Sequence, residues 1–562
     1  MSAQTIRKIH FVEFNAKINT LMHAPVFPKY GTPLLATIMK EKGYDVKMYL
    51  DGVSRMKFEE LIDCDCLCLP LVIPAYNKVK AFVRRVKQVR PGLPVIIGGP
   101  TAIMYPERVI DLCDYTVRCE GDEVLPELIE TIGTGGDVSR VRGISFKRNG
   151  EVVNTPDRLP PQIPRTIPDY SLIQGIQRLT FGPGRLNNLV NTLQTSRGCT
   201  FRCAFCPTPH LFGYTFRNRD IDSIIADIKH KQKYNDWFLV VDNSFFGNRQ
   251  KARDLLNRLI EEDLGAELTV FERHEIGFDD EMLDLMKRAG VRCLIVGVES
   301  LVDENLKAFN KKQTSLKALQ SINNIKKHGL HVIGTFAFGF TGDTKEKAGE
   351  LAEFIKKTGL SLNVFILHDV HMEESDELII PLNRRFMTYY QQTDPDNTDF
   401  LDYATGSFLT YFPAQMKPSS LQKCIVDIYK QTYTHRYILS FLFRKNVFES
   451  LMGIVHGYGI RRMNKSIERI CNDYYYDYLR QVEEGLYDEN EHLQEDKLRA
   501  LKSIPMPKPV EEKVDMFSYQ PLIMLVIGPA FFRYLLQKLR HRLRRKAAAP
   551  KLGPVAGRES NI

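Results

Sequence analysis

Short apolar runs alternate with longer amphipathic stretches over the first 130 residues of the chain. Runs such as Ile9–Phe14 and Tyr115–Val117 are typical of buried strands. Stretches such as Thr32–Lys42 and Tyr76–Arg90 have the spacing of apolar positions expected of helices. Strands that alternate with helices predict a parallel sheet covered on both faces, with ligands bound at the carboxyl ends of the strands. We therefore expect an α/β, Rossmann-like domain over residues 1–140.

The same alternation returns between residues 189 and 380. Six strand–helix units predict a partial, TIM-type (β/α)6 barrel, whose chemistry would lie at the carboxyl ends of its strands. Between the two domains, residues 141–188 form a predicted connector, with a hairpin turning at Asn149-Gly150 and then a proline-rich link. The expected barrel strands are Val190–Thr195, Phe238–Asp242, Glu267–Glu272, Cys293–Val298, Val332–Phe338 and Leu362–Leu367.

The last third of the chain differs from the rest in composition and in predicted structure. Residues 381–505 are rich in Tyr and Phe and predict a helical domain, in which packing explains the aromatic side chains better than a binding site does. Residues 506–562 form a linker and a tail, in which the apolar run Pro521–Phe532 is too short to span a bilayer, a task that needs about 20 residues. A basic amphipathic segment follows it, so we expect peripheral contact with an anionic membrane surface, with a tail docked on the protein as the alternative.

Charge is concentrated in that tail. From Arg533 onwards there are nine Lys or Arg and one acidic residue, a net +8 out of the formal +9 of the whole chain. The rest is near neutral, which gives no reason to expect a nucleic acid as partner. Met1–His10 lacks the apolar segment of a signal peptide and the 11 cysteines show no disulfide framework, so we expect a cytoplasmic protein.

Cys199, Cys203 and Cys206 form a C-x3-C-x2-C pattern within eight residues, directly after the first predicted barrel strand. Three thiolates can bind three irons of a cubane cluster and leave the fourth iron open for chemistry. Zinc favours four ligands in paired spacings, and a disulfide would leave one cysteine over. Structural zinc and buried thiols are the remaining alternatives.

This motif, with Phe205 before its last cysteine, resembles that of the radical S-adenosylmethionine (SAM) superfamily. The resemblance implies a [4Fe–4S] cluster on the three cysteines, with the amino and carboxylate groups of SAM on the open iron and Phe205 packed on the adenine. In that family the cluster gives SAM one electron, and the 5′-deoxyadenosyl radical that forms abstracts hydrogen. An external electron donor such as flavodoxin or ferredoxin is then expected.

The first domain adds a second resemblance. The segments Tyr30–Tyr44, Gly98-Gly99-Pro100 and Asp114–Glu123, taken in order, are similar to the cobalamin-binding domain that precedes the radical domain in one large branch of the superfamily. Thr101 stands where many members have His, and the chain lacks a D-x-H-x-x-G motif, so the cobalamin expected here has no protein His ligand. The implied cobalamin contacts are Gly98, Gly99, Pro100, Thr101, Glu120 and Gly121.

Other strand ends of the barrel supply further candidates for binding SAM. The resemblance places Glu299 and Ser300, after the fourth strand, near the ribose and methionine parts of SAM, and Gly334, on the fifth, near the adenine. Asp242 ends the second strand and is a candidate by position. Capping of the following helices is the alternative role for Asp242 and Glu299.

Taken together, the resemblances imply an enzyme that uses cobalamin as methyl carrier and methylates an unactivated carbon of a small-molecule or lipid-like substrate. Oxidative cyclisation, ring contraction or carbon–carbon coupling without net methyl transfer is the alternative within the same branch. A transfer-RNA methylthiotransferase is disfavoured, because Cys64, Cys66 and Cys68 are too crowded for that family's second cluster. A non-enzymatic cobalamin or iron–sulfur sensor is the alternative from another class.

Overall fold

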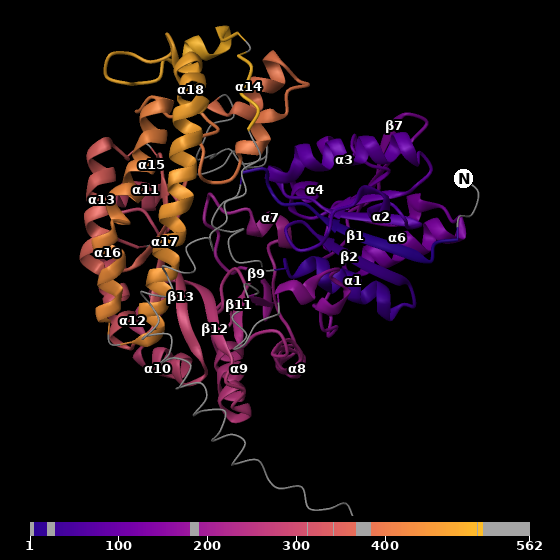
Figure 1. Ribbon diagram of the computed structural model, residues 1–562, viewed down its shortest axis with the longest axis horizontal. Helices are drawn as coiled ribbons and strands as arrows, with labels where there is room; N and C mark the ends of the chain where they lie inside the picture. The colour runs from indigo at the N-terminus through magenta and orange to yellow at the C-terminus, as the bar shows by residue number, and fades with distance from the viewer. Residues whose placement is uncertain are drawn as a thin grey trace, which may run out of the picture.

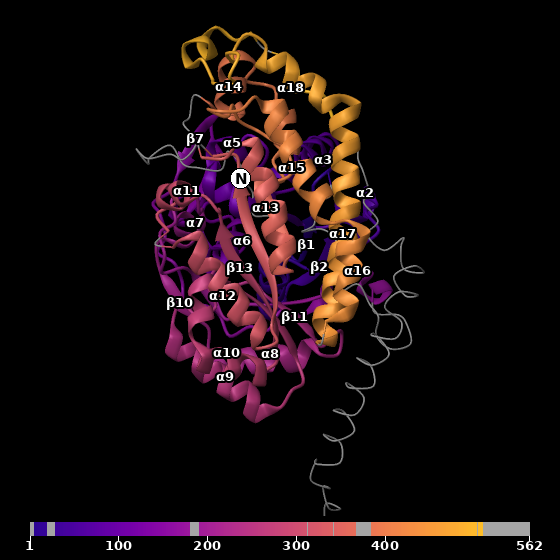
Figure 2. The same ribbon diagram turned by 90° about the vertical axis from the view of Figure 1, so that its left-hand side faces the viewer.

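The computed structural model of the chain describes residues 5–18, 28–179, 190–366 and 384–509, except the single positions 312, 341, 445 and 503. The described residues form two large sheets in separate lobes and one two-stranded sheet, with a helical region beside the second lobe (Figures 1 and 2). This is the α/β architecture predicted from the pattern of the sequence. The predicted apolar and basic tail segments, residues 521–546, lie outside the described residues. Within the described part, every helix is too short or too polar to cross a bilayer.

The first lobe is built on a seven-stranded sheet with the strand order β2-β1-β3-β4-β5-β6-β7. Its first five strands in sequence pair in parallel, as predicted. The hairpin β6–β7 turns at Asn149 and Gly150, both with positive φ, and β6 pairs antiparallel with β5. The sheet thus extends past residue 140, because Ile144 and Phe146 bury their side chains in the same core. The strands are β1 (Lys8–Glu13), β2 (Asp45–Leu50), β3 (Cys66–Pro70), β4 (Val95–Gly98), β5 (Tyr115–Val117), β6 (Ile144–Arg148) and β7 (Glu151–Asn154).

Helices cover both faces of this sheet, each with its apolar side inward. Val79, Val83 and Val86 of α3 pack on one face, and Ala36 and Met39 of α1 pack on the other. Spacings of three and four residues place these side chains on one stripe of each helix. The helices are α1 (Gly31–Glu41), α2 (Phe58–Leu61), α3 (Tyr76–Val89), α4 (Pro100–Met104), α5 (Pro106–Val109) and α6 (Gly121–Thr134).

The second lobe contains a six-stranded, fully parallel sheet with the order β15-β14-β13-β12-β11-β8, which is the predicted incomplete barrel. All six of its strands start and end within two residues of the predicted limits. The strands are β8 (Asn191–Leu193), β11 (Trp237–Val240), β12 (Glu267–Arg273), β13 (Val291–Glu299), β14 (His331–Phe338) and β15 (Ser361–Ile366). The helices of this lobe are α7 (Thr208–Phe212), α8 (Ile221–Lys231), α9 (Arg249–Glu262), α10 (Asp280–Arg288), α11 (Asp303–Ala308), α12 (Ser315–Lys327) and α13 (Lys345–Thr358).

The first barrel strand is shorter than predicted, because the chain leaves the sheet after Leu193 and forms a small antiparallel ladder. Strand β9 (Ser196–Gly198) pairs there with β10 (Phe216–Asn218). Gly198 has a φ of +86°, and a Cβ at this position would overlap the carbonyl oxygen of Thr215. Only glycine fits, so this residue fixes the path of the chain one position before Cys199.

The helical region packs against the barrel helices, and its core is aromatic. The rings of Tyr403 and Tyr475 stack at 4.6 Å between centroids, and both side chains are buried. Tyr475 and Tyr478 therefore serve packing, as predicted. The long α17 runs along one side of the molecule in Figure 2. The helices are α14 (Phe386–Thr393), α15 (Pro418–Thr432), α16 (His435–Ser440), α17 (Val447–Ile470) and α18 (Tyr476–Glu483).

A buried group of charged and polar side chains joins the two lobes. Asp227 of α8 forms ion pairs with Arg219 at 2.7 Å and Lys231 at 2.8 Å, and the side chains of all three are fully buried. Tyr30, at the start of α1 in the first lobe, donates its hydroxyl to Asp227 at 3.1 Å. A buried charge that loses a partner destabilises the fold strongly. The hydrogen bond from Tyr30 to the buried Asp227 therefore holds the first lobe against the second.

Candidate cofactor site

The three motif cysteines lie in one loop that follows β9, and all three are free and partly buried. The loop is folded on itself, with the Cys206 amide donating to the Cys203 carbonyl at 3.0 Å. Burial raises the pKa of the Cys199 and Cys203 thiols, and the neighbouring thiols raise both further. The three sulfurs are thus close enough to act on one another electrostatically.

Two cations offset the cost of ionising Cys203. Lys311 and Arg273 lower the pKa of this thiol against the effect of burial, and Arg273 Nη1 lies 3.6 Å from its sulfur. Cations beside a cysteine favour the thiolate, which is the form that binds metal. Within the described residues, no three His, Cys, Asp or Glu side chains converge on a single metal ion. A cubane is larger than one ion and spaces its ligands apart, so three soft thiolates with cationic neighbours fit an iron–sulfur cluster.

Asp242 holds the start of the cysteine segment and is not exposed to a ligand. Its carboxylate accepts hydrogen bonds from the Thr195 amide at 2.8 Å and the Ser196 hydroxyl at 2.7 Å, and from the Thr195 hydroxyl. Burial raises the pKa of Asp242 to about 6, although the hydrogen bonds from Thr195 oppose that rise. The side chain neither touches the cysteines nor caps a helix, so its observed contacts position β9 and the loop beyond it.

Glu299 and Ser300 end β13 in a strained turn. Glu299 has a φ of +67° and forms an ion pair with Lys311 at 2.6 Å. Because Lys311 also acts on Cys203, this ion pair connects the end of β13 to the cysteine loop. The Ser300 hydroxyl accepts from the Val302 amide at 3.0 Å, which makes it a local turn contact. Positive φ at a non-glycine residue is costly and is concentrated at functional sites.

Phe205 lies beside the carboxyl end of β14. Its ring meets Phe309 edge to face at 5.2 Å, and both pack with Ala337 of β14 and Phe340. Gly334 lies further back on that strand, where a Cβ would be 3.0 Å from both Leu360 and Phe336. The side chains of Leu360 and Phe336 therefore fill the space beside Gly334.

The Gly98–Thr101 loop follows β4 and brings the first lobe to the cysteine loop. Gly99 has a φ of +93°, and a Cβ there would be 3.1 Å from the Leu71 carbonyl oxygen, so glycine lets the ends of β3 and β4 approach closely. Helix α4, which begins at Pro100, contacts α7, and α7 begins two residues after Cys206. The Thr101 hydroxyl is buried and has no hydrogen-bond partner among the described residues. An orphaned hydroxyl on this loop fits the presence of a polar ligand such as cobalamin.

Glu120 binds two arginines of the barrel lobe. Its carboxylate pairs with Arg197 Nη1 at 2.5 Å and with Arg217, and all three side chains are about nine-tenths buried. Asp122 forms a second carboxylate pair with Arg197, with one contact at 3.1 Å. The following Gly121 packs on Leu35 of α1. Glu120 thus joins the start of α6 to β9, two residues before Cys199.

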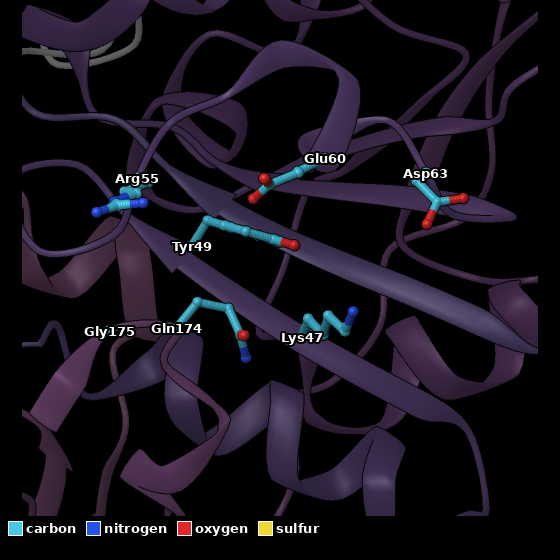
Figure 3. Close-up of a pocket in the computed structure, with 7 residues that line it drawn as sticks. All are labelled: Lys47, Tyr49, Arg55, Glu60, Asp63, Gln174 and Gly175. Atoms are coloured by element: carbon cyan, nitrogen blue, oxygen red, sulfur yellow. The ribbon is translucent and has the colours of Figure 1, made fainter.

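A separate hollow lies at the edge strand β2 and shares no residue with the groups above. It has a volume of about 290 Å³, and Figure 3 shows charged side chains of both signs on its walls. The lining residues are Lys47, Tyr49, Arg55, Glu60, Asp63, Gln174 and Gly175.

Sequence patterns did not single out Arg197, Arg217 or Lys311 as members of this site. Arg197 lies inside the motif segment, two residues before Cys199, which is the one signal that could have identified it. The partners of these residues come from distant parts of the chain, and only the fold brings them together.

Comparison with known proteins finds one family match within each of the two lobes. Residues 18–129 match the model of the B12 binding domain, and residues 193–355 match that of the radical SAM superfamily. An uncharacterized methyltransferase of Pyrococcus horikoshii is 27% identical over 356 residues, which are 60% of this chain and 75% of the relative. A hopanoid C-2 methylase of Rhodopseudomonas palustris is 25% identical over 382 residues, 64% of this chain and 67% of that protein. An anaerobic magnesium-protoporphyrin IX monomethyl ester cyclase of Rubrivivax gelatinosus is 26% identical, but this chain spans only 61% of its length.

Two solved structures have the same arrangement of lobes. The radical SAM methyltransferase TsrM from Kitasatospora setae, with cobalamin and a [4Fe–4S] cluster bound, has a TM-score of 0.60 over 83% of this chain and 100% of that chain, at 14% identity. The cobalamin-dependent radical SAM enzyme OxsB has a TM-score of 0.52 over 97% of this chain and 82% of that chain, at 13% identity. At these identities the structures show the fold alone. The chain thus has a B12-binding domain followed by a radical SAM domain, and these two matches imply a [4Fe–4S] cluster, SAM and cobalamin.

Proposed function

We propose that this enzyme is a cobalamin-dependent radical SAM methyltransferase that methylates an unactivated carbon of a small-molecule or lipid-like substrate. The observation that supports the proposal most is the meeting of two loops from different lobes. Helix α4, after the Gly98–Pro100 loop, contacts α7 behind Cys206, and Glu120 binds Arg197 ahead of Cys199. A methyl carrier and a radical source act on one carbon only if they are held close together.

In this proposal Cys199, Cys203 and Cys206 bind the cluster. When bound, the cluster and SAM supply a hydrogen-abstracting 5′-deoxyadenosyl radical, and cobalamin supplies the methyl group. Lys311 and Arg273 stabilise the thiolate form of Cys203. Asp242 holds β9, the strand that leads into the cysteine loop.

The remaining contacts are assigned to the two organic cofactors. Phe205, beside the end of β14, would pack on the adenine of SAM, and Glu299 with Ser300 would contact its ribose and methionine parts. The Gly98–Pro100 backbone and the Thr101 hydroxyl would hold cobalamin.

The nature of the substrate is supported by the relatives. Besides the hopanoid C-2 methylase, they include a bacteriochlorophyllide d C-8(2)-methyltransferase of Chlorobaculum tepidum, 26% identical over 302 residues. The names of both point to large, mostly apolar substrates. A lipid-like substrate would also suit the predicted membrane contact of the tail, and the electron would come from an external donor such as flavodoxin or ferredoxin.

A second candidate function is ring formation without net methyl transfer. The cyclase from Rubrivivax gelatinosus supports it, since its identity to this chain equals that of the bacteriochlorophyllide methyltransferase. The nature of the product separates the two functions, because only a methyltransferase adds a labelled methyl group to its product.

The test begins with anaerobic reconstitution of the full chain with iron and sulfide, followed by measurement of 5′-deoxyadenosine with and without cobalamin. C199A, C203A and C206A are each expected to lose the cluster absorbance and to reduce 5′-deoxyadenosine to background. C113A is the control, because Cys113 is also partly buried but lies at the amino end of β5. Full cleavage in any of the three motif variants would refute the cluster assignment. With SAM labelled in its methyl group, an unlabelled cyclised product would favour the cyclase instead.

A further inference from the structure

Helix α3 of the first lobe is strongly cationic. From Tyr76 to Arg90 it has six Lys or Arg and no acidic residue. Lys80 and Arg84 line an open cavity beside the helix, and neither forms an ion pair within the described residues. The other four have partners: Lys78 with Asp51, Arg85 with Glu59, Lys87 with Asp114, and Arg90 with the Ile62 carbonyl.

The cavity lies between α3, the end of α5 and residues 395–398 of the helical region. Its volume is about 600 Å³, which is within the range of small-molecule sites. In Figure 1, α3 runs along the upper edge of the first lobe, toward the side where α14 lies. The walls contain apolar surface from Tyr76, Val83, Leu112 and Pro395.

The charges on these walls are unbalanced. Lys87 of α3 and Arg108 of α5 also line the cavity. Lys87 is bound to Asp114 at 2.6 Å, whereas within the described residues the Arg108 guanidinium has no carboxylate partner. The lining acids are Asp111, which is bound to Lys147 at 2.7 Å, and Asp396. Lys80 donates to the Thr398 hydroxyl at 3.2 Å instead of to an acid. Partial burial and the neighbouring Arg84 lower the pKa of Lys80, and the nearby Asp396 and Asp399 only partly oppose that change.

We propose that this cavity binds a ligand with a phosphate group, held by Lys80, Arg84 and Arg108. A guanidinium matches two oxygens of a phosphate, and two arginines with one lysine surround such an anion from several sides. The anion also relieves the repulsion among the three cations, and the apolar wall accepts the rest of the ligand. The phosphate belongs either to a soluble small molecule or to a phospholipid headgroup. None of the candidate cofactor residues lines the cavity, so this proposal is independent of the proposed function.

The test uses the full chain and two probes: inorganic phosphate, followed by calorimetry, and phosphatidylglycerol vesicles, followed by co-sedimentation with phosphatidylcholine vesicles as the control. R84Q and R108Q are each expected to weaken binding about tenfold, since a charge-assisted hydrogen bond contributes about 1.5–3 kcal/mol. R85Q is the matched control, because Arg85 is the next residue on the same helix, is equally exposed and does not line the cavity.

Phosphate binding that depends on Arg84 and Arg108 supports a soluble ligand, and vesicle binding with the same dependence supports a lipid headgroup. Absence of binding to both probes would overturn the proposal. An equal loss in R85Q would also overturn it, because that result would show general attraction to a cationic helix.

Discussion

Removing the charge of Glu120 tests whether the first lobe holds the cysteine loop in place. Arg197 and Arg217 are directly opposite each other in the β9–β10 ladder, and like charges in that position destabilise a strand pair. Glu120 is the one carboxylate paired with Arg217 within the described residues, whereas Arg197 keeps Asp122. E120Q should therefore loosen this ladder while leaving the rest of the fold in place.

The expected size follows from the burial of the three side chains. Removing one partner of a buried ion pair costs about 3–5 kcal/mol. Glutamine still accepts one hydrogen bond and Asp122 still neutralises Arg197, so we expect about 2 kcal/mol. Hydrogen exchange at residues 196–198 and 216–218 should then be roughly 30 times faster than in the unaltered chain, since each 1.4 kcal/mol is a factor of ten.

The assay is hydrogen exchange read by mass spectrometry on peptides that cover the ladder. E123Q is the matched control, because Glu123 lies in the first turn of α6, three residues after Glu120, but its side chain, paired with Arg158 at 2.9 Å, is about half exposed. Exposed pairs contribute about 0–1 kcal/mol, so exchange in the ladder should change little in E123Q. Equal exchange in E120Q and the unaltered chain would refute the reasoning, as would an equal acceleration in both variants.

Two further changes test the segment around the cysteines. G198A should lower the thermal midpoint far more than G150A, because both glycines have positive φ but only Gly198 lacks room for a Cβ; equal midpoints would contradict this. Asp242 has a pKa of about 6 in the folded chain, above its usual value of 3.8, so its protonated form is favoured by folding and its contribution to stability is lost as pH rises through 6. The thermal midpoint of the unaltered chain should therefore fall relative to that of D242N between pH 5 and pH 7, and a constant difference would show that Asp242 does not titrate there.

Patterns along the chain predicted the architecture well, because buried parallel strands require continuous apolar runs and the covering helices require an apolar stripe. Ile9–Phe14 and Tyr115–Val117 became β1 and β5 with at most one residue of difference. The departure at Val190–Thr195 has a local cause, since Asp242 draws Thr195 and Ser196 away from the sheet. Local patterns report burial well but do not report which buried polar groups face one another.

The same limit explains which residues of the candidate site could be predicted from the sequence and which could not. Phe205 lies beside the end of β14, and its contact with adenine stays a prediction. Glu120 was predicted as a ligand contact, but its observed partners are Arg197 and Arg217, which are 77 and 97 residues further along the chain. Lys311 acquires its role from the ion pair with Glu299 and its nearness to Cys203. Such pairings depend on how the lobes dock.

The long-range partners of the first lobe have a consequence for synthesis on the ribosome. The first sheet can form as soon as its hairpin strands emerge, but Tyr30 must wait for Asp227, 197 residues later in the chain. Asp227 lies 73 residues after Asn154, the end of the hairpin, so at about 5–20 residues per second the nascent lobe spends roughly 4–15 seconds with its docking face open to water. During that interval the carboxylates of Glu120 and Asp122 are hydrated, and that water is released only when Arg197 and Arg217 of the barrel lobe arrive.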